Sequence, residues 1–227
     1  MHELILKGVS SKAFPLLTVR NLGKRKRATQ DIEVLDVPLA NRSVTITHDT
    51  FQPYARPMSF MCKDYETMTK VFAWLTGVGR LETSDDVGYY FRSFATSFSE
   101  VERVGCDWYL FDAEFIVDPL AYRKDGETSQ VFTAAGTISN PGTWASEPII
   151  KVTGTDGTVS IGGKTIQLKS INDTVTIDSD KKLVYTGTLN QGKNMVGDFP
   201  VLAVGDNTVS FSGNITKVEI IPRWCEV

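Results

Sequence analysis

Apolar and polar residues alternate along most of the chain, and the alternation is clearest near its C-terminal end. Thr208–Ser212 and Val218–Arg223 each place apolar side chains on one face, and this period of two indicates half-buried strands. Turn-forming residues lie before and between them, at Val204–Asn207 and at Ser212–Asn214. The pattern predicts an antiparallel pair whose apolar face must be buried against another sheet.

The first half of the chain shows the same kind of pattern in shorter pieces. Alternating segments separated by turn residues predict a series of strands before residue 119. These are Leu4–Leu6, Phe14–Arg20, Asp31–Val37, Arg42–Thr50, Ala55–Lys63, Arg80–Thr83, Tyr89–Phe98 and Trp108–Asp118.

One segment of the first half, about residues 64–76, has the period of a helix instead. Asp64 can cap its N-terminus. An apolar stripe recurs at helical spacing, formed by Tyr65, Met68, Phe72 and Leu75. Gly77 and Gly79 supply a stop. We expect this helix to lie across a sheet with its apolar stripe in the core.

The polar segment Arg123–Ser129 interrupts the alternation and marks a domain boundary. Residues 128–227 are richer in Thr, Gly and Asn, with frequent turn signals such as Thr153–Gly157 and Ile161–Lys164, which predict hairpins. The sequence therefore predicts a mainly β protein. Residues 1–127 form a β-sandwich-like domain with one α-helix, and residues 128–227 form an all-β sandwich.

Composition and charge narrow the class of protein. The chain has 227 residues, 24 Lys and Arg against 27 Asp and Glu, and the balance is similar in both halves, so neither half is a basic nucleic-acid module. No segment has the pattern of a signal peptide or a membrane span, so we expect no membrane partner. The three cysteines, Cys62, Cys106 and Cys225, are widely spaced and favour free thiols in a reducing cytosol over a disulfide or a metal site.

Candidate catalytic residues are few. His48 and Asp49 are adjacent on a strand and point to opposite faces, which argues against a nucleophilic triad. Asp112 and Glu114 share a strand face, as glycosidase carboxylates can, but exposed charged residues on strands are far commoner. No phosphate-binding loop is present, because the glycine-rich turns lack the required spacing and a following helix. We expect no enzyme activity, no metal and no cofactor.

Lys24, Arg25, Lys26 and Arg27 form the one run of like charge. Three interpretations stand: a solvated loop, a contact with an acidic patch on a neighbouring subunit, or a contact with nucleic acid. Nucleic acid fits worst, because no aromatic residues interleave the basic ones. We treat these four residues as candidate contacts with another subunit or partner.

Trp144 lies in a polar stretch, where an exposed indole could stack on a sugar ring. A partly buried Trp that docks a linker on a sheet is the commoner arrangement. Trp144 is the candidate on which a carbohydrate-binding interpretation would depend.

Three sequence blocks in the second half resemble phage distal tail proteins, often called Dit. The C-terminal block has a Phe-Pro-x-Leu segment, a Gly-Asp-Asn turn, a Ser-Phe-Ser-Gly segment and a closing Ile-Ile-Pro-Arg-Trp. The other two blocks are Ile138–Val152 and Val175–Ser179. The first half resembles the family mainly in length and pattern.

The resemblance implies a structural virion protein of a long non-contractile tail, made in the cytoplasm of a bacterial host. It implies a ring, a homohexamer, with the second domains outside it in a galectin-like sandwich fold. The expected partners are the tail tube protein, the tail-tip hub protein and, in some phages, receptor-binding proteins. The alternative is a carbohydrate-binding module that recognises the host cell wall.

Overall fold

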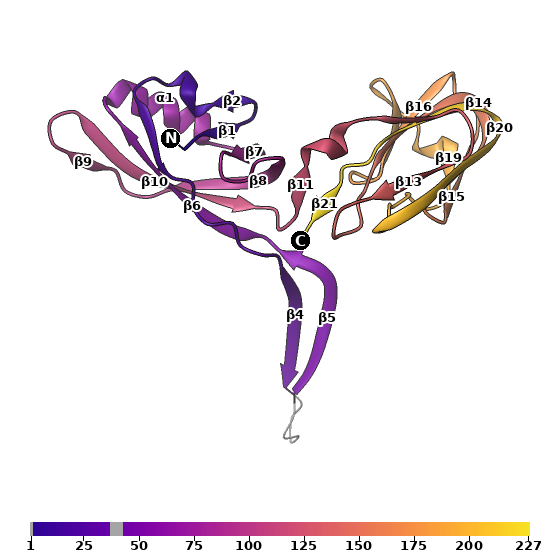
Figure 1. Cartoon of the computed structure of the whole chain (residues 1–227), viewed down its shortest axis with the longest axis horizontal. Helices are drawn as coiled ribbons and strands as arrows, with labels where there is room; N and C mark the ends of the chain where they lie inside the picture. The colour runs from indigo at the N-terminus through magenta and orange to yellow at the C-terminus, as the bar shows by residue number, and fades with distance from the viewer. Residues whose placement is uncertain (1, 37–42) are drawn as a thin grey trace. The chain divides into compact units, whose positions relative to one another are not determined.

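The computed structural model describes residues 2–36 and 43–227, and its course is drawn in Figure 1. The chain divides into two compact units, one ending at Ala121 and the other spanning Tyr122–Glu226. Val37 and Arg42, the facing ends of two expected strands, lie outside the described residues. The described part is mainly β with one α-helix, as the sequence predicts.

The strands of the first unit are antiparallel and follow the expected segments closely. They are β1 (Leu4–Leu6), β2 (Val9–Ser10), β3 (Leu17–Asn21), β4 (Thr29–Asp36), β5 (Ser43–Gln52), β6 (Tyr54–Cys62), β7 (Gly79–Thr83), β8 (Tyr89–Phe98), β9 (Glu102–Val104) and β10 (Trp108–Val117). The main sheet has the order β2-β1-β7-β8-β10-β6-β3, and β9 pairs with the start of β10. Strands β4 and β5 form a separate two-stranded sheet.

The helix α1 (Tyr65–Leu75) begins and ends where its sequence signals lie. The Asp64 carboxylate accepts a hydrogen bond from the backbone N–H of Thr67 at 2.6 Å, and this bond lowers the pKa of Asp64. Tyr65, expected in the stripe, is 66% exposed, whereas the side chains that the helix buries are Met68, Val71, Trp74 and Leu75. Because these residues recur every three or four positions, they form one stripe that packs in the core of the first unit.

The core of the first unit lies between the helix and one face of the sheet. In the central pair of strands, Phe111 of β10 is directly opposite Phe60 of β6, and their rings stack with centroids 5.6 Å apart. Cys62 is buried in the same core, and burial, together with the charge of Asp64, raises the pKa of its thiol to about 12. A thiol held neutral in this way is an apolar packing residue.

The second unit contains the remaining strands, and β11 (Ala121–Arg123) leads into it along the chain. They are β12 (Gln130–Phe132), β13 (Gly136–Asn140), β14 (Ile149–Ile161), β15 (Lys164–Leu168), β16 (Thr174–Asp178), β17 (Leu183–Thr186), β18 (Leu189–Asn190), β19 (Met195–Val196), β20 (Gly205–Ile221) and β21 (Cys225–Glu226). The strand order in the sheet of this unit is β12-β20-β14-β16-β17-β18. In addition, β13 pairs with β20, and β15 pairs with both β14 and β19. Its buried side chains form a core separate from that of the first unit.

Two expected turns of the second unit are wrong. Thr153–Gly157 and Ser212–Asn214 do not reverse the chain; they are bulges inside the long strands β14 and β20, which pair with each other on both sides of the irregularity. Gly213 has φ of +80°, and a Cβ on Gly157 would lie 2.2 Å from the carbonyl oxygen of Ser212. Glycine is therefore required here because the backbones of the two paired strands approach closely at the bulge.

The expected antiparallel pair near the C-terminus is corrected in the same way. Thr208–Ser212 and Val218–Arg223 do not pair with each other, because both belong to the one extended segment around β20. Their partner is β14, where Val152 is opposite Val218 and Ile150 is opposite Ile220. The turn expected at Ile161–Lys164 is confirmed by the pairing of β14 with β15.

Candidate assembly surface

The strands β4 and β5 form a hairpin that extends away from the rest of the first unit (Figure 1). Ile32 is opposite Thr47, Val34 is opposite Thr45, and the pairing continues to Asp36. Eight residues of strand span roughly 25 Å at the usual rise per residue. A two-stranded sheet of this length is marginally stable by itself in water, because neither face is covered by another layer.

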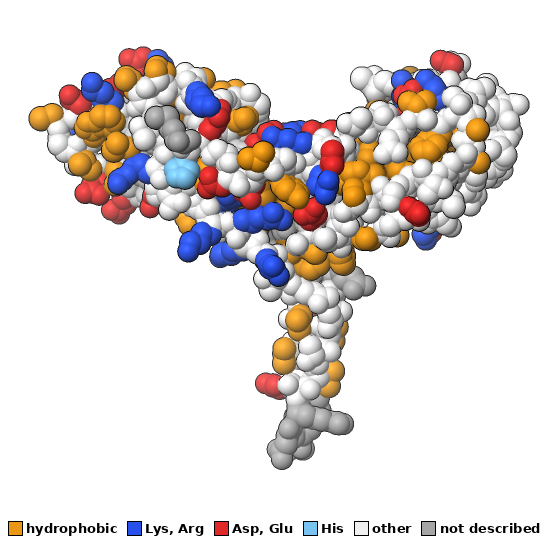
Figure 2. Space-filling model, viewed as in Figure 1, with side chains coloured by type: hydrophobic (Ala, Val, Ile, Leu, Met, Phe, Trp, Pro, Cys, Tyr) orange, Lys and Arg blue, Asp and Glu red, His pale blue; other side chains and the backbone are white. Residues whose placement is uncertain are grey.

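Both faces of this hairpin carry apolar side chains that are exposed. Val34, on one face, is 60% exposed. Leu35, on the other face, has Val44 opposite it in the register, and both are exposed. Figure 2 shows hydrophobic side chains along the hairpin surface that faces the viewer. Contiguous apolar surface of this kind marks a protein interaction site in a soluble protein.

The same hairpin is acidic. Its first strand carries Asp31, Glu33 and Asp36, and residues 29–36 and 43–52 contain no Lys or Arg. Glu33 lies 3.9 Å from the imidazole of His48, and the Asp31 carboxylate accepts a hydrogen bond from Gln52 at 2.9 Å. The apolar residues of the hairpin are therefore interspersed with negative charge.

The basic run Lys24–Arg27 lies immediately before the hairpin, between β3 and β4. All four side chains are exposed. Within residues 2–36 and 43–227, Lys24, Lys26 and Arg27 make no ion pair with any carboxylate. Three positive charges without an ion pair in these residues therefore lie at the base of an acidic hairpin with exposed apolar side chains.

A buried arginine fixes the start of this basic loop. Arg56 of β6 is 1% exposed, and its Nη1 pairs with the Asp86 carboxylate at 2.9 Å. Its Nε donates to the carbonyl of Leu22 at 2.9 Å, and its Nη2 donates to that of Gly23. Gly23 has φ of +65°, and a Cβ there would lie 2.2 Å from the carbonyl oxygen of Pro57. The backbone that enters the loop is therefore held against β6.

Arg25 differs from the other three basic residues because it contacts the first unit. Its guanidinium lies 5.5 Å from the ring centroids of both Tyr89 and Phe91. Arg25 therefore anchors the middle of the loop, and Lys24, Lys26 and Arg27 are the charges available to a partner.

The other candidate residues do not gather into a site. Asp112 and Glu114 are exposed on the face of β10 opposite its buried residues, and His48 lies on the hairpin. Trp144 is half-buried, forms an isolated bridge with Cys225, and its carbonyl accepts a hydrogen bond from the Asn140 side chain at 3.0 Å. The backbone around Trp144 is thus tied into the second unit.

Two further observations bear on the chemistry of the surface. Across residues 2–36 and 43–227, no group of three or more His, Cys, Asp and Glu side chains is arranged to hold a metal ion. None of the helices in these ranges has the length and apolar composition needed to cross a membrane.

The sequence predicted the two hairpin strands and the basic run, but not that the hairpin would stand apart from the sheet. The available signal was its composition: apolar residues on both faces of a strand, without the buried aromatic residues that mark the neighbouring strands. The Arg56 anchor had no sequence signal, because a single arginine within a strand gives no indication that it is buried.

Comparisons with known proteins give one clear result. No protein-family model and no curated protein matches the sequence. Among solved structures, the chain is similar to a crystal structure of the Dit protein (gp 19.1) of phage SPP1, with a TM-score of 0.72 and 11% sequence identity. The match covers 97% of this chain and 98% of the SPP1 chain, whose protein is described as a paradigm of the hub adsorption apparatus in phages that infect Gram-positive hosts. The chain therefore has the fold of a distal tail protein, as the sequence blocks predicted.

Proposed function

We propose that this chain is a structural subunit of a phage tail tip, without enzyme activity. Copies of it form a closed ring of six at the distal end of a long non-contractile tail, between the tail tube protein and the tail-tip hub protein. The observation that supports this most is the fold shared with SPP1 Dit over nearly the full length of both chains. In this proposal the protein is made in the host cytoplasm and resides in the virion, where it also holds receptor-binding proteins.

The hairpin supports assembly because its apolar faces are left uncovered by the rest of residues 2–36 and 43–227. Val34, Leu35 and Ile46 come from both strands and both faces, and all are exposed. Burying the exposed half of such a side chain contributes about 1 kcal/mol. A contact along the hairpin with another subunit would supply the layer that the hairpin lacks.

Charge supports a particular arrangement of that contact. The strand β4 carries Glu33 and Asp36, and the loop at its root carries Lys24 and Lys26, which have no carboxylate partner among the described residues. We place the acidic hairpin of one subunit against the basic loop of the next. Such a contact joins two different surfaces, so it repeats from copy to copy and closes into a ring when the rotation allows.

The first test is the size of the purified chain in solution. Light scattering with negative-stain microscopy, done with and without the tail tube protein, should give closed rings. A strict monomer at tens of micromolar under both conditions contradicts the proposal.

The second test asks whether the hairpin and the loop contact each other. The pair Lys24→Glu and Lys26→Glu should weaken ring formation, and so should the pair Glu33→Lys and Asp36→Lys, because each places like charges together. Combining all four changes should restore rings. If the combined variant is no better than either pair, the two surfaces do not meet.

A matched control tests whether loss of apolar area matters specifically on the hairpin. Val34→Asn and Val131→Asn remove apolar groups that are similarly exposed, one on the hairpin and the other on β12 of the second unit. Only Val34→Asn should weaken assembly. Equal effects would mean that the hairpin has no special role.

A further inference from the structure

Two adjoining hollows lie along β17 of the second unit. The first has a volume of about 270 Å³ and the second about 340 Å³. Leu183, Val184 and Asn190 line both. Each hollow is of a size that holds one or two apolar side chains of a bound segment, near the lower end of the range for binding pockets.

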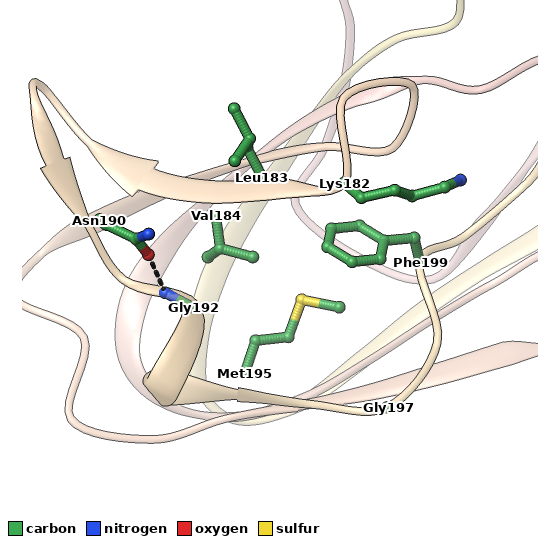
Figure 3. Close-up of a pocket in the computed structure, with 8 residues that line it drawn as sticks. All are labelled: Lys182, Leu183, Val184, Asn190, Gly192, Met195, Gly197 and Phe199. Atoms are coloured by element: carbon green, nitrogen blue, oxygen red, sulfur yellow. Dashed lines mark hydrogen bonds between the residues drawn. The ribbon is translucent and has the colours of Figure 1, made fainter.

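The first hollow has an apolar interior (Figure 3). The side chains of Val184, Met195 and Phe199 face one another across it, and all three pack on the core of the second unit. Lys182 lies along its rim with the ammonium 5.7 Å from the centroid of the Phe199 ring. That ammonium is also paired with the Glu147 carboxylate at 2.7 Å.

The walls of the first hollow are held by the backbone around it. The Asn190 side-chain oxygen accepts a hydrogen bond from the backbone N–H of Gly192 at 2.7 Å. Gly197 has φ of +122°, and a Cβ there would lie 2.5 Å from the carbonyl oxygen of Thr165. The segment that closes the hollow is therefore fixed before any ligand binds, which lowers the entropic cost of binding.

The second hollow is lined by Tyr185, Thr188, Lys181 and the Asp178 carboxylate. Asp178 is already engaged by Arg223, whose two terminal nitrogens lie 2.7 and 3.1 Å from its oxygens.

Exposed apolar residues surround the two hollows. Leu183, which lines both, is 46% exposed, and Leu189 of β18 is 67% exposed. Val196 of β19, the residue before Gly197, is exposed as well. These side chains extend the apolar surface beyond the hollows, as at the edges of protein interfaces.

Two exposed lysines lie beside the hollows, and the charge of one of them, Lys181, is near enough to the Asp178 carboxylate to help lower the pKa of that group. Lys181 lines the second hollow, and Lys193 lies between Gly192 and Met195 in the chain. Both are exposed, and neither has an ion pair in the described part of the chain. A partner with carboxylates next to its apolar side chains would complement them.

The first hollow suits a sugar poorly. A sugar site needs several convergent polar groups beside an open aromatic face. Here the ammonium of Lys182 lies over the Phe199 ring and is paired with Glu147, and the oxygen of Asn190 is used by Gly192.

We propose that these two hollows bind an extended segment of another protein, one whose apolar side chains alternate with Asp or Glu. The apolar side chains occupy the hollows on either side of Leu183, and the carboxylates pair with Lys181 and Lys193. This site is independent of the ring contact proposed above, which uses only residues of the first unit. It gives the second unit a way to hold a second kind of protein.

The test uses the full chain and a display library of random peptides of about 12 residues, long enough to span both hollows. Selection should enrich peptides in which apolar residues alternate with Asp or Glu. Leu183→Glu should weaken the selected peptides at least about tenfold, because it places a carboxylate between the hollows. The matched control is Val131→Glu, at another exposed apolar residue, which lies on β12 at the other end of the strand order, and it should leave binding unchanged.

Two further measurements decide the chemistry. Lys181→Glu with Lys193→Glu should weaken the same peptides, and raising salt from about 0.05 to about 0.5 M should weaken the unaltered chain in the same direction. No enrichment, or equal binding to Leu183→Glu, overturns the proposal. Binding of N-acetylglucosamine oligomers that Leu183→Glu abolishes would also overturn it, in favour of a carbohydrate site. Ring formation by Leu183→Glu should be normal, so this result is separable from the assembly tests.

Discussion

The hairpin β4–β5 and the pair β14–β20 are both long antiparallel ribbons with alternating apolar residues, but those residues are exposed in the first and buried in the second. In β14–β20 the apolar side chains are buried in the second core, and Ile220 is fully buried. In β4–β5 the equivalent side chains, such as Val34, face solvent on both sides of the ribbon. The same local pattern therefore specifies a strand without specifying what covers it.

The two ribbons differ in burial, and they also differ in where their bulges lie. Gly154, Gly157 and Gly213 allow the paired strands β14 and β20 to bulge where their backbones approach closely. Both long strands can therefore pack their apolar side chains in the second core. The hairpin has one register shift near its root, between Gln30 and Ile32, and then continues as a regular ribbon away from the first unit. A ribbon whose apolar side chains stay exposed in the described part of its own chain presents a surface that another chain can cover.

The largest expected contrast comes from the same truncation in both ribbons. Ile220→Ala should lower the free energy of unfolding by about 2–5 kcal/mol, because it leaves a cavity in a packed core. Ile46→Ala, in the exposed hairpin, should change it by less than about 0.5 kcal/mol. Urea unfolding of both variants as monomers measures this. Similar losses would mean that the hairpin already packs within its own chain.

The second contrast concerns charge within the second unit. Asp178 is nearly buried; burial alone would raise its pKa, but the hydrogen bonds and charge of Arg223 lower it overall. A lowered folded-state pKa gives stability that is present above the unfolded pKa and lost as the pH falls through the folded one. Asp178→Asn should cost about 2–3 kcal/mol at neutral pH.

The pH profile then checks the origin of that loss. The gap between Asp178→Asn and the unaltered chain should be constant from about pH 5 to 7. It should begin to shrink below about pH 4, where Asp178 of the unfolded chain becomes protonated, and it should close as the pH falls through the lowered pKa of the folded state. A gap that does not change with pH would mean that the substitution acts through packing instead of charge.

Sequence reasoning recovered those parts of this molecule in which local signals and tertiary structure agree. Asp64 and the stripe that includes Phe72 fix the helix, and the aromatic strands fix the first core. It failed at Thr153–Gly157 and Ser212–Asn214, because glycine and asparagine favour turns and bulges by the same backbone freedom.

The candidate surface was predictable only in part, for a related reason. The run of basic residues is visible in the sequence, but its anchor on Arg56 depends on a contact between positions far apart in the chain. The hollows beside Leu183 depend on the positions of three short strands and one 3-10 turn, each too short to carry a sequence pattern.

A smaller effect is expected at Trp144, where a substitution distinguishes a packing role from a sugar-stacking role. Trp144→Ala should lower the free energy of unfolding by about 1–3 kcal/mol, because the indole is half-buried and its removal takes away that packing. The same variant should leave glycan-array signals at background, as in the unaltered chain. Millimolar or tighter binding to a host-wall polysaccharide, lost in Trp144→Ala without loss of stability, would favour the carbohydrate-binding function instead.

The smallest effect on the monomer is expected in the basic loop, although its effect on assembly should be large. Lys24, Lys26 and Arg27 have no carboxylate partner in the described residues, so changing these three to Ser should alter the free energy of unfolding by less than about 0.5 kcal/mol. Arg25→Ser should cost about 0.5–1 kcal/mol more, because its guanidinium packs over Tyr89 and Phe91.

Assembly should respond in the reverse order. The triple variant should weaken ring formation, most strongly at low salt, where charges on the loop are least screened. Arg25→Ser alone should weaken it less, because that residue is engaged within its own subunit. Thermal unfolding of the monomers and light scattering of the assemblies, measured on the same samples, separate the two effects. If the triple variant assembles normally at low salt, the loop is a solvated surface, and the hairpin contacts a different surface of its partner.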